Sequence, residues 1–135
     1  MINLAVMVST ARRAALLAAN APIPPVQQIR GLVDTGASHT CIDPVVFQAL
    51  QLQPTGSVAM HTPSTGGTPM NADTYDVSIL IPSTPTSAPF HKENMQVSAA
   101  DLLTAQGFHA LIGRDILAHC PMTYNGSMQL LTVAY

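Results

Sequence analysis

The apolar residues at the start of the chain recur at every second position, a spacing typical of a β-strand. They are Ile2, Leu4, Val6 and Val8. Ser9 or Thr10 can cap a helix, and the Ala- and Leu-rich segment Ala11–Asn20 predicts a short one. Three prolines between positions 22 and 25 follow. Proline cannot continue a helix, so extended chain is expected there.

Alternating and apolar runs then predict two strands, Val26–Val33 and Ser38–Ile42. The tight turn Asp34-Thr35-Gly36 joins them, since Asp, Thr and Gly all favour turns. The Asp-Pro pair at positions 43 and 44 predicts a capped helix start, and Val45–Leu50 follows as a short helix.

A long hairpin is predicted for positions 57–81. Val58–Thr62 runs outward and Ala72–Ile81 returns with clear alternation. The tip contains two adjacent glycines, which permit sharp bending. We assign the tip to Ser64, Thr65, Gly66 and Gly67.

The C-terminal half is also divided into short elements. A strand over Phe90–Val97, one or two helical turns within Ala99–Gln106, a strand over Ala110–Ile112 and a helix over Asp115–His119 are predicted. Asn-Gly at 125–126 is a strong hairpin signal between Met122–Tyr124 and Met128–Val133. The whole pattern predicts a mainly β domain with two or three short helices, in the form of a partly closed barrel.

Composition sets limits on size and partners. The 135 residues suffice for one domain, spanning 1–135, with one core. Charged residues make up 9% of the chain, against about 25% in typical domains, and 47% of residues are apolar. This balance predicts a face buried against a partner. Five basic residues against seven acidic ones do not form a nucleic-acid footprint. No apolar run approaches the roughly 20 residues of a membrane span.

The cysteines and histidines predict no cofactor. Cys41 and Cys120 are too few for a disulfide scaffold, so reduced thiols in a cytoplasmic protein are expected. A secretory signal needs an early positive region followed by an apolar stretch. Here Arg12 and Arg13 come too late, and only the short stretch Ala14–Ala19 follows them, so no such signal is expected. His39 lies two residues before Cys41, and His119 adjoins Cys120, but neither pair has a recognised zinc-ligand spacing. We therefore expect no metal.

Asp34 is the most informative ionisable residue, because it directly follows an apolar strand. A carboxylate in that position is costly unless it is hydrogen-bonded, and the Thr35 hydroxyl and Gly36 amide can supply such bonds. One interpretation is a simple turn in which Asp34 bonds backbone two residues on. The other is a functional carboxylate.

Two motifs favour the functional interpretation. Leu32-Val33-Asp34-Thr35-Gly36-Ala37 resembles the active-site strand of aspartic proteases, and Ala110-Leu111-Ile112-Gly113-Arg114-Asp115 resembles the helix entry near the C-terminus of retroviral-type (retropepsin-like) proteases. The glycine-bearing hairpin lies between them, where that family has its flap. The resemblance covers roughly residues 26–133 and leaves 1–25 as an N-terminal strand-helix extension.

The resemblance implies a homodimer. Hydrolysis of a peptide bond by this route needs two carboxylates that share one proton, and the chain holds one Asp-Thr-Gly motif. Asp34 and its mate in a second chain would lie about 3 Å apart across a twofold axis. The implied activity is that of an aspartic endopeptidase acting on extended peptides, with no nucleic acid, membrane or cofactor involved.

The resemblance also implies roles for the remaining site residues. Thr35 would interlock the two active-site loops, and Gly36 would let the substrate backbone approach. The expected substrate-contacting residues are Ala37, His109, Leu111, Ile112 and the tip Ser64, Thr65, Gly66 and Gly67. The expected structural residues are Gly113, Arg114 and Asp115, with a buried or half-buried Arg114 guanidinium holding the C-terminal helix to the active-site strand.

Two alternatives remain open from the residues alone. One is a catalytically silent dimerisation or peptide-binding module on the same fold, because fold does not fix function. The other is a domain matured from a longer polyprotein, against which Met1 at the start of the pattern favours a free-standing chain. The chain also departs from the viral pattern, which has an acid four residues after the catalytic aspartate. Here that position is Ser38, followed by His39.

Overall fold

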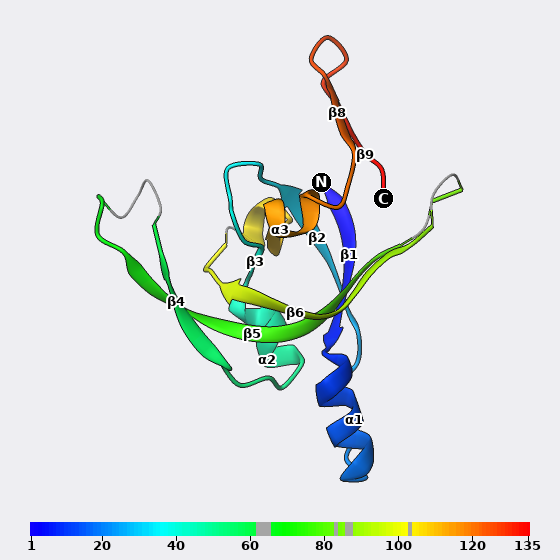
Figure 1. The fold of residues 1–135 in the computed structure, drawn as a ribbon, viewed down its shortest axis with the longest axis vertical. Coiled ribbons are helices and arrows are strands. Elements are labelled where there is room, and N and C mark those ends of the chain that lie inside the picture. The colour runs from blue at the N-terminus through cyan, green and yellow to red at the C-terminus, as the bar shows by residue number, and fades with distance from the viewer. Residues whose placement is uncertain (62–65, 83, 86–87, 103) are drawn as a thin grey trace.

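A ring of six hydrogen-bonded strands forms the centre of the protein. The structure, a computed structural model, describes residues 1–61, 66–82, 84–85, 88–102 and 104–135. In order around the ring, the strands are β1 (Ile2–Val8), β2 (Gln27–Val33), β7 (Ala110–Ile112), β3 (Cys41–Ile42), β6 (Phe90–Ala99) and β5 (Met70–Ile81). β5 pairs back onto β1 and closes the ring. The predicted mainly β barrel is confirmed, and it is closed (Figure 1).

The strand β4 (Gly56–Met60) extends the sheet beyond the ring by pairing with β5. The two strands form the predicted long hairpin (Figure 1). Gly66 and Gly67, beyond the end of β4, have φ angles of 59° and 86°, a left-handed conformation that glycine adopts without strain. The other two predicted tip residues, Ser64 and Thr65, lie outside the described residues.

Two helices begin where the sequence supplies a side-chain cap. α1 (Thr10–Ala18) starts at Ser9, whose side chain accepts a bond from Arg12 N at 3.1 Å. α2 (Pro44–Ala49) starts at Asp43, which accepts from Val45 N at 3.0 Å. α3 (Arg114–Leu117) is a single turn. Side-chain caps satisfy amides that have no partner inside the helix, which is why these two caps were predictable.

The core fills the barrel and extends under α2. Phe47 of α2 is fully buried and stacks on Tyr75 of β5, with ring centroids 3.9 Å apart and planes 8° from parallel. The largest other fully buried side chains are Leu4, Ile42, Leu50, Ile79, Ile81, Ile112 and Ile116. Every strand of the ring therefore contributes to one apolar core.

Several predicted elements are shorter in the structure, among them the strand predicted over Met128–Val133, which covers Leu130–Val133. The strand predicted over Ser38–Ile42 is reduced to the two residues of β3, because the preceding loop bonds to α3 instead. Of the helical turns predicted within Ala99–Gln106, the described residues form a 3₁₀ turn at Thr104–Gln106, and Ala99 ends β6. α3 ends at Leu117, before His119.

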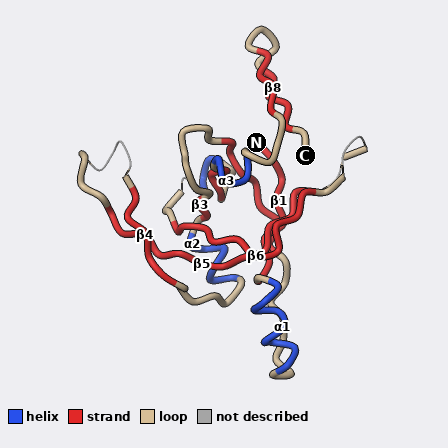
Figure 2. Tube along the Cα trace, viewed as in Figure 1, coloured by secondary structure: helices blue, strands red, loops and turns tan. Residues whose placement is uncertain are grey.

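Two segments project from the barrel in opposite directions (Figures 1 and 2). One is α1. The other is a separate two-stranded hairpin of β8 (Met122–Asn125) and β9 (Leu130–Val133), drawn in orange and red. None of the helices in the described part of the chain has the length and apolar character needed to cross a bilayer.

Candidate active site

Asp34 lies at the end of β2, where the barrel hydrogen bonds fix its backbone. β2 runs parallel to β7, and Asp34 N donates to Ile112 O at 3.0 Å. One carboxylate oxygen, Oδ1, accepts from Gly36 N at 2.9 Å. The turn interpretation is thus correct for that oxygen. Within the described part of the chain Oδ2 accepts no hydrogen bond and remains available for chemistry.

Five hydrogen bonds tie the loop after Asp34 to the start of α3. The Arg114 backbone N donates to Ala37 O at 3.0 Å, and its guanidinium Nη2 donates to Ser38 Oγ at 2.9 Å. Thr40 donates to both oxygens of Asp115, from its backbone N at 2.8 Å and from its Oγ1 at 2.7 Å. The fifth bond runs from Gly113 N to Thr40 Oγ1 at 3.1 Å. We call this set the loop–helix lock.

Gly113 is required by close backbone contact. A Cβ at this position would lie 2.5 Å from the carbonyl carbon of His39 and 2.9 Å from Thr40 N, and neither backbone atom can move aside. The absence of a side chain lets α3 approach the active-site loop closely enough for the lock to form. The expectation that Gly113, Arg114 and Asp115 hold the two motifs together agrees with this geometry. One detail is corrected: the Arg114 side chain is exposed, because its partner Ser38 lies at the surface.

Thr40 is the buried centre of the lock, so Thr40→Val should destabilise the fold. The substitution removes the bond to Asp115 and leaves the buried Gly113 N without an acceptor. We expect the free energy of unfolding to fall by about 2–4 kcal/mol. Urea denaturation at one fixed protein concentration measures it. Thr104→Val, at an exposed position of the 3₁₀ turn, is the matched control and should change stability by less than about 0.5 kcal/mol. Equal unfolding midpoints for Thr40→Val and wild type would contradict the role of the lock.

Asp34 opens into a groove of about 570 Å³ between the active-site loop and the β4–β5 hairpin. The groove is lined by Asp34, Gly36, Ala37, Ser38, His39, Cys41, Val58, Ala59, Met60, His61, Ser98 and Leu111. The floor comes from the loop after β2 and from Leu111 of β7, and one wall comes from β4 and the residue after it. The arrangement places a carboxylate in the lining of a groove between the loop after β2 and β4.

Cys41 also lines the groove but is a poor nucleophile. Burial raises the pKa of its thiol, and the charges of Asp115 and Asp34 raise it further. The thiol therefore stays protonated near neutral pH, and the thiolate is the reactive form. Cys41 and Cys120 are both free and buried. Among the described residues, no group of three or more His, Cys, Asp or Glu side chains is placed to hold a metal ion.

The structure brings some of the predicted site residues together and separates others. Asp34, Gly36, Ala37 and Leu111 meet at the groove, and Thr35 is exposed on the turn beside it. Ile112 is fully buried in the core, because side chains alternate along β7 and Leu111 takes the groove side.

His109 also lies away from the groove, before the start of β7. Its backbone is held between Arg30 O, to which it donates at 2.8 Å, and Asp43 N, from which it accepts at 2.9 Å. Its ring atom Nδ1 is buried without a hydrogen-bond partner among the described residues. Gly66 and Gly67 are exposed beyond the groove lining.

Sequence reasoning missed the groove residues on the hairpin side and Thr40. Val58, Met60 and His61 were placed on the outgoing arm of the hairpin without a site role, although an arm that covers a groove must turn some side chains toward it. No local sequence pattern marks Thr40 as important, because its hydrogen-bond partners Gly113 and Asp115 are more than 70 residues away in the sequence.

The fold is that of the acid-protease class: a closed β-barrel carries an Asp-Thr-Gly turn at a groove, and a Gly-Arg-Asp helix entry is bonded to the loop after that turn. Comparison with family models agrees: the model described as aspartyl protease matches residues 26–116. The chain belongs to this aspartyl protease family, which is of retropepsin-like type. No match was found among curated proteins.

Proposed function

We propose that the protein is a homodimeric aspartic endopeptidase. The observation that carries the proposal is the position of Asp34, which is held by its backbone and by one oxygen at the base of the groove, with its other oxygen free of hydrogen bonds to the described residues. One chain supplies one such carboxylate, and the chemistry needs two. A second copy of the chain is the simplest source of the other.

The proposed reaction uses the two Asp34 carboxyl groups in a form that holds one proton. The ionised carboxylate takes a proton from a water molecule, whose oxygen attacks the carbonyl carbon of the peptide bond, while the protonated carboxyl gives its proton to the carbonyl oxygen. The carboxyl group that took the proton from water then gives it to the amide nitrogen, while the other carboxylate takes a proton from a hydroxyl of the diol, so that the carbon–nitrogen bond breaks and a carboxylic acid and an amine leave. The pair ends the cycle with one proton again.

The β8–β9 hairpin supports the dimer. Residues 121–135 contain no Asp, Glu, Lys, Arg or His. The hairpin nevertheless exposes five large apolar side chains: Met122, Tyr124, Met128, Leu130 and Leu131. A two-stranded hairpin alone is marginally stable in water, and an exposed apolar patch of this kind marks an interaction site. A second copy fits it, because no charge opposes contact with an identical hairpin.

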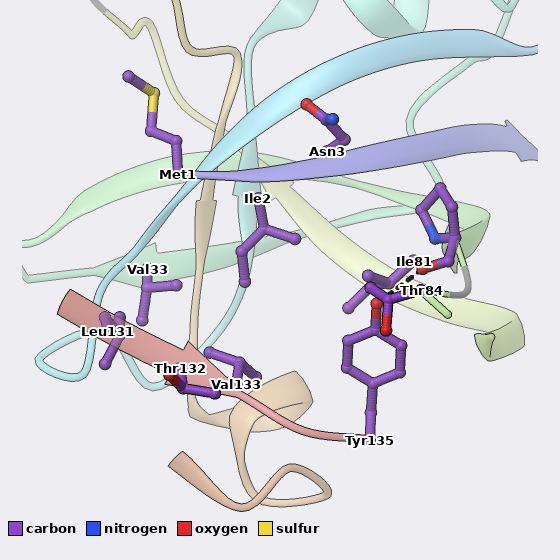
Figure 3. A pocket seen from close by; sticks show the side chains of 11 residues that line it. Met1, Ile2, Asn3, Val33, Ile81, Thr84, Leu131, Thr132, Val133 and Tyr135 are labelled. Carbon is purple, nitrogen blue, oxygen red and sulfur yellow. Dashed lines mark hydrogen bonds between the residues drawn. The ribbon is translucent and has the colours of Figure 1, made fainter. Parts of the chain in front are cut away.

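A cleft of about 430 Å³ lies beside the hairpin, between β1 and β9 (Figure 3). Ile2 of β1 and Val133 of β9 line it, and Tyr135 closes one end by donating from Oη to Pro82 O at 2.7 Å. Val33, directly before Asp34, lines the same cleft. A partner segment seated there would contact the strand that carries the catalytic residue, which couples assembly to the site.

The substrate is proposed to lie extended between the active-site loop and β4, as an added strand would. Leu111 and Ala37 offer apolar contact from the floor, and Val58 and Met60 offer it from β4. The hairpin beyond β4 would close over the peptide and exclude water, with the glycines at 66 and 67 permitting the bend.

The test of the proposed function is the pH dependence of cleavage. Hydrolysis of an unfolded protein such as reduced, alkylated casein should follow a bell-shaped curve with its optimum below pH 7. At low pH both carboxyl groups are protonated and the base is lost, and at high pH both are ionised and the acid is lost. A rate that keeps rising to pH 9 would exclude the shared-proton pair.

A further inference from the structure

The charge of the groove depends on two histidines. Among the described lining residues the ionisable side chains are Asp34, Cys41, His39 and His61. Cys41 stays neutral, because burial and the nearby carboxylates raise its thiol pKa. No lysine, arginine or glutamate from the described residues lines the groove. Apart from Asp34 and the neutral Cys41, His39 and His61 are thus the described lining residues that can carry a charge, and Asp115 and Arg114 lie beside His39 just outside the lining.

His39 lies on the floor side and is open to a ligand. Its side chain is 69% exposed, and its nearest acidic neighbour is Asp115 of α3, with Nδ1 and Oδ2 4.0 Å apart. Both oxygens of Asp115 already accept bonds, from Thr40 and from Ile116 N. The guanidinium of Arg114 is held on the neighbouring Ser38, which adds a permanent positive charge to the same side.

His61 lies on the opposite side, directly after the last residue of β4, and is exposed. Three other ionisable groups line the groove with it: Asp34 at the end of β2, Cys41 of β3 and His39 of the loop between them. Within the described residues no acidic side chain other than Asp34 lines the groove to neutralise this pair.

We propose that the groove selects peptides that carry an Asp or Glu side chain near the scissile bond, with His39 and His61 as the residues that bind the carboxylate. The inference rests on the proposed function, since it names the substrate class of the same site. Histidine side chains ordinarily gain a positive charge as pH falls through about 6.5, whereas Asp and Glu side chains ordinarily remain ionised down to about pH 4. In the interval between, a charge-assisted hydrogen bond forms from imidazolium to carboxylate. That interval lies within the acidic range proposed for the catalytic pair.

The test is a synthetic random-sequence peptide pool, cleaved at pH 5 and at pH 7.5 and read by mass spectrometry. We expect Asp and Glu to be enriched about fivefold near the cleaved bonds at pH 5, and the enrichment to fall toward one at pH 7.5. His39→Gln combined with His61→Gln should remove the enrichment at pH 5. His119→Gln, at an exposed position that does not line the groove, is the matched control and should retain it.

Cleavage without acidic enrichment, or enrichment that survives the double substitution, would overturn this inference while leaving the proposed function intact. Absence of any cleavage would count against the proposed function. In that case the inference is decided by the uncleaved peptides of the same pool that stay bound to the wild-type protein at pH 5. Enrichment of Asp and Glu among the bound peptides supports an acid-selective groove, and absence of that enrichment overturns it.

Discussion

Asp34→Asn is expected to lower the rate of peptide cleavage by about a thousandfold or more. The amide cannot take the proton from water, so a dimer in which both chains carry the substitution has neither base nor acid. The backbone bonds to Ile112 and the acceptor for Gly36 N survive, because an amide oxygen can replace Oδ1. The measurement is the initial rate on unfolded casein at the pH optimum of the wild type.

The matched control is Asp76→Asn, which makes the same change at an exposed position of β5 outside the groove. It should keep the wild-type rate. Circular dichroism and sedimentation should show that both variants keep the fold and the assembly state. Equal cleavage by Asp34→Asn and wild type would remove Asp34 from the reaction.

Glutamates placed on the β8–β9 hairpin should abolish activity by separating the two chains. Tyr124 and Leu130 are 69% and 50% exposed in the single chain, so Tyr124→Glu with Leu130→Glu costs little within it. At an interface the same charges would be buried without partners, which should weaken the dimer at least about thirtyfold. Sedimentation equilibrium measures the dissociation constant, and activity should fall with it.

Leu17→Glu provides the control, because Leu17 is also an exposed apolar residue but lies on α1. It should leave both assembly and activity unchanged. Deleting Leu130–Tyr135 should likewise give an inactive monomer, although Tyr135 and Val133 also pack on the core. A double glutamate variant that stays dimeric and active at low protein concentration would show that another surface carries the assembly.

Local signals predicted most of the fold. The caps at Ser9 and Asp43 place α1 and α2, and alternation places β1 and β5, because these features depend on neighbours within a few residues. The predicted strand at 38–42 failed for the opposite reason. Its first residues bond to α3, which is more than 70 residues further along the chain, and such a tertiary contact overrides local β propensity.

The candidate site was predictable where a motif marked it. Asp34 and the Gly113–Asp115 segment follow from their residue types, but the side of the strand on which each neighbour lies does not. Leu111 and Ile112 were expected to act alike, yet β7 turns one to the groove and the other to the core. To predict that His61 lines the groove, one must know where the hairpin lies relative to the groove. That position depends on the pairing of β4 with β5, which no local motif marks.

One active site is proposed to take an Asp34 from each of two chains, and mixing the wild type with an inactive variant tests this most directly. A fixed amount of wild type is allowed to exchange subunits with increasing Asp34→Asn. Random pairing predicts that activity falls to about half with an equal amount of the variant and to about one tenth with a tenfold excess. Activity that stays constant at every ratio would mean that each chain works alone, and the account would be wrong.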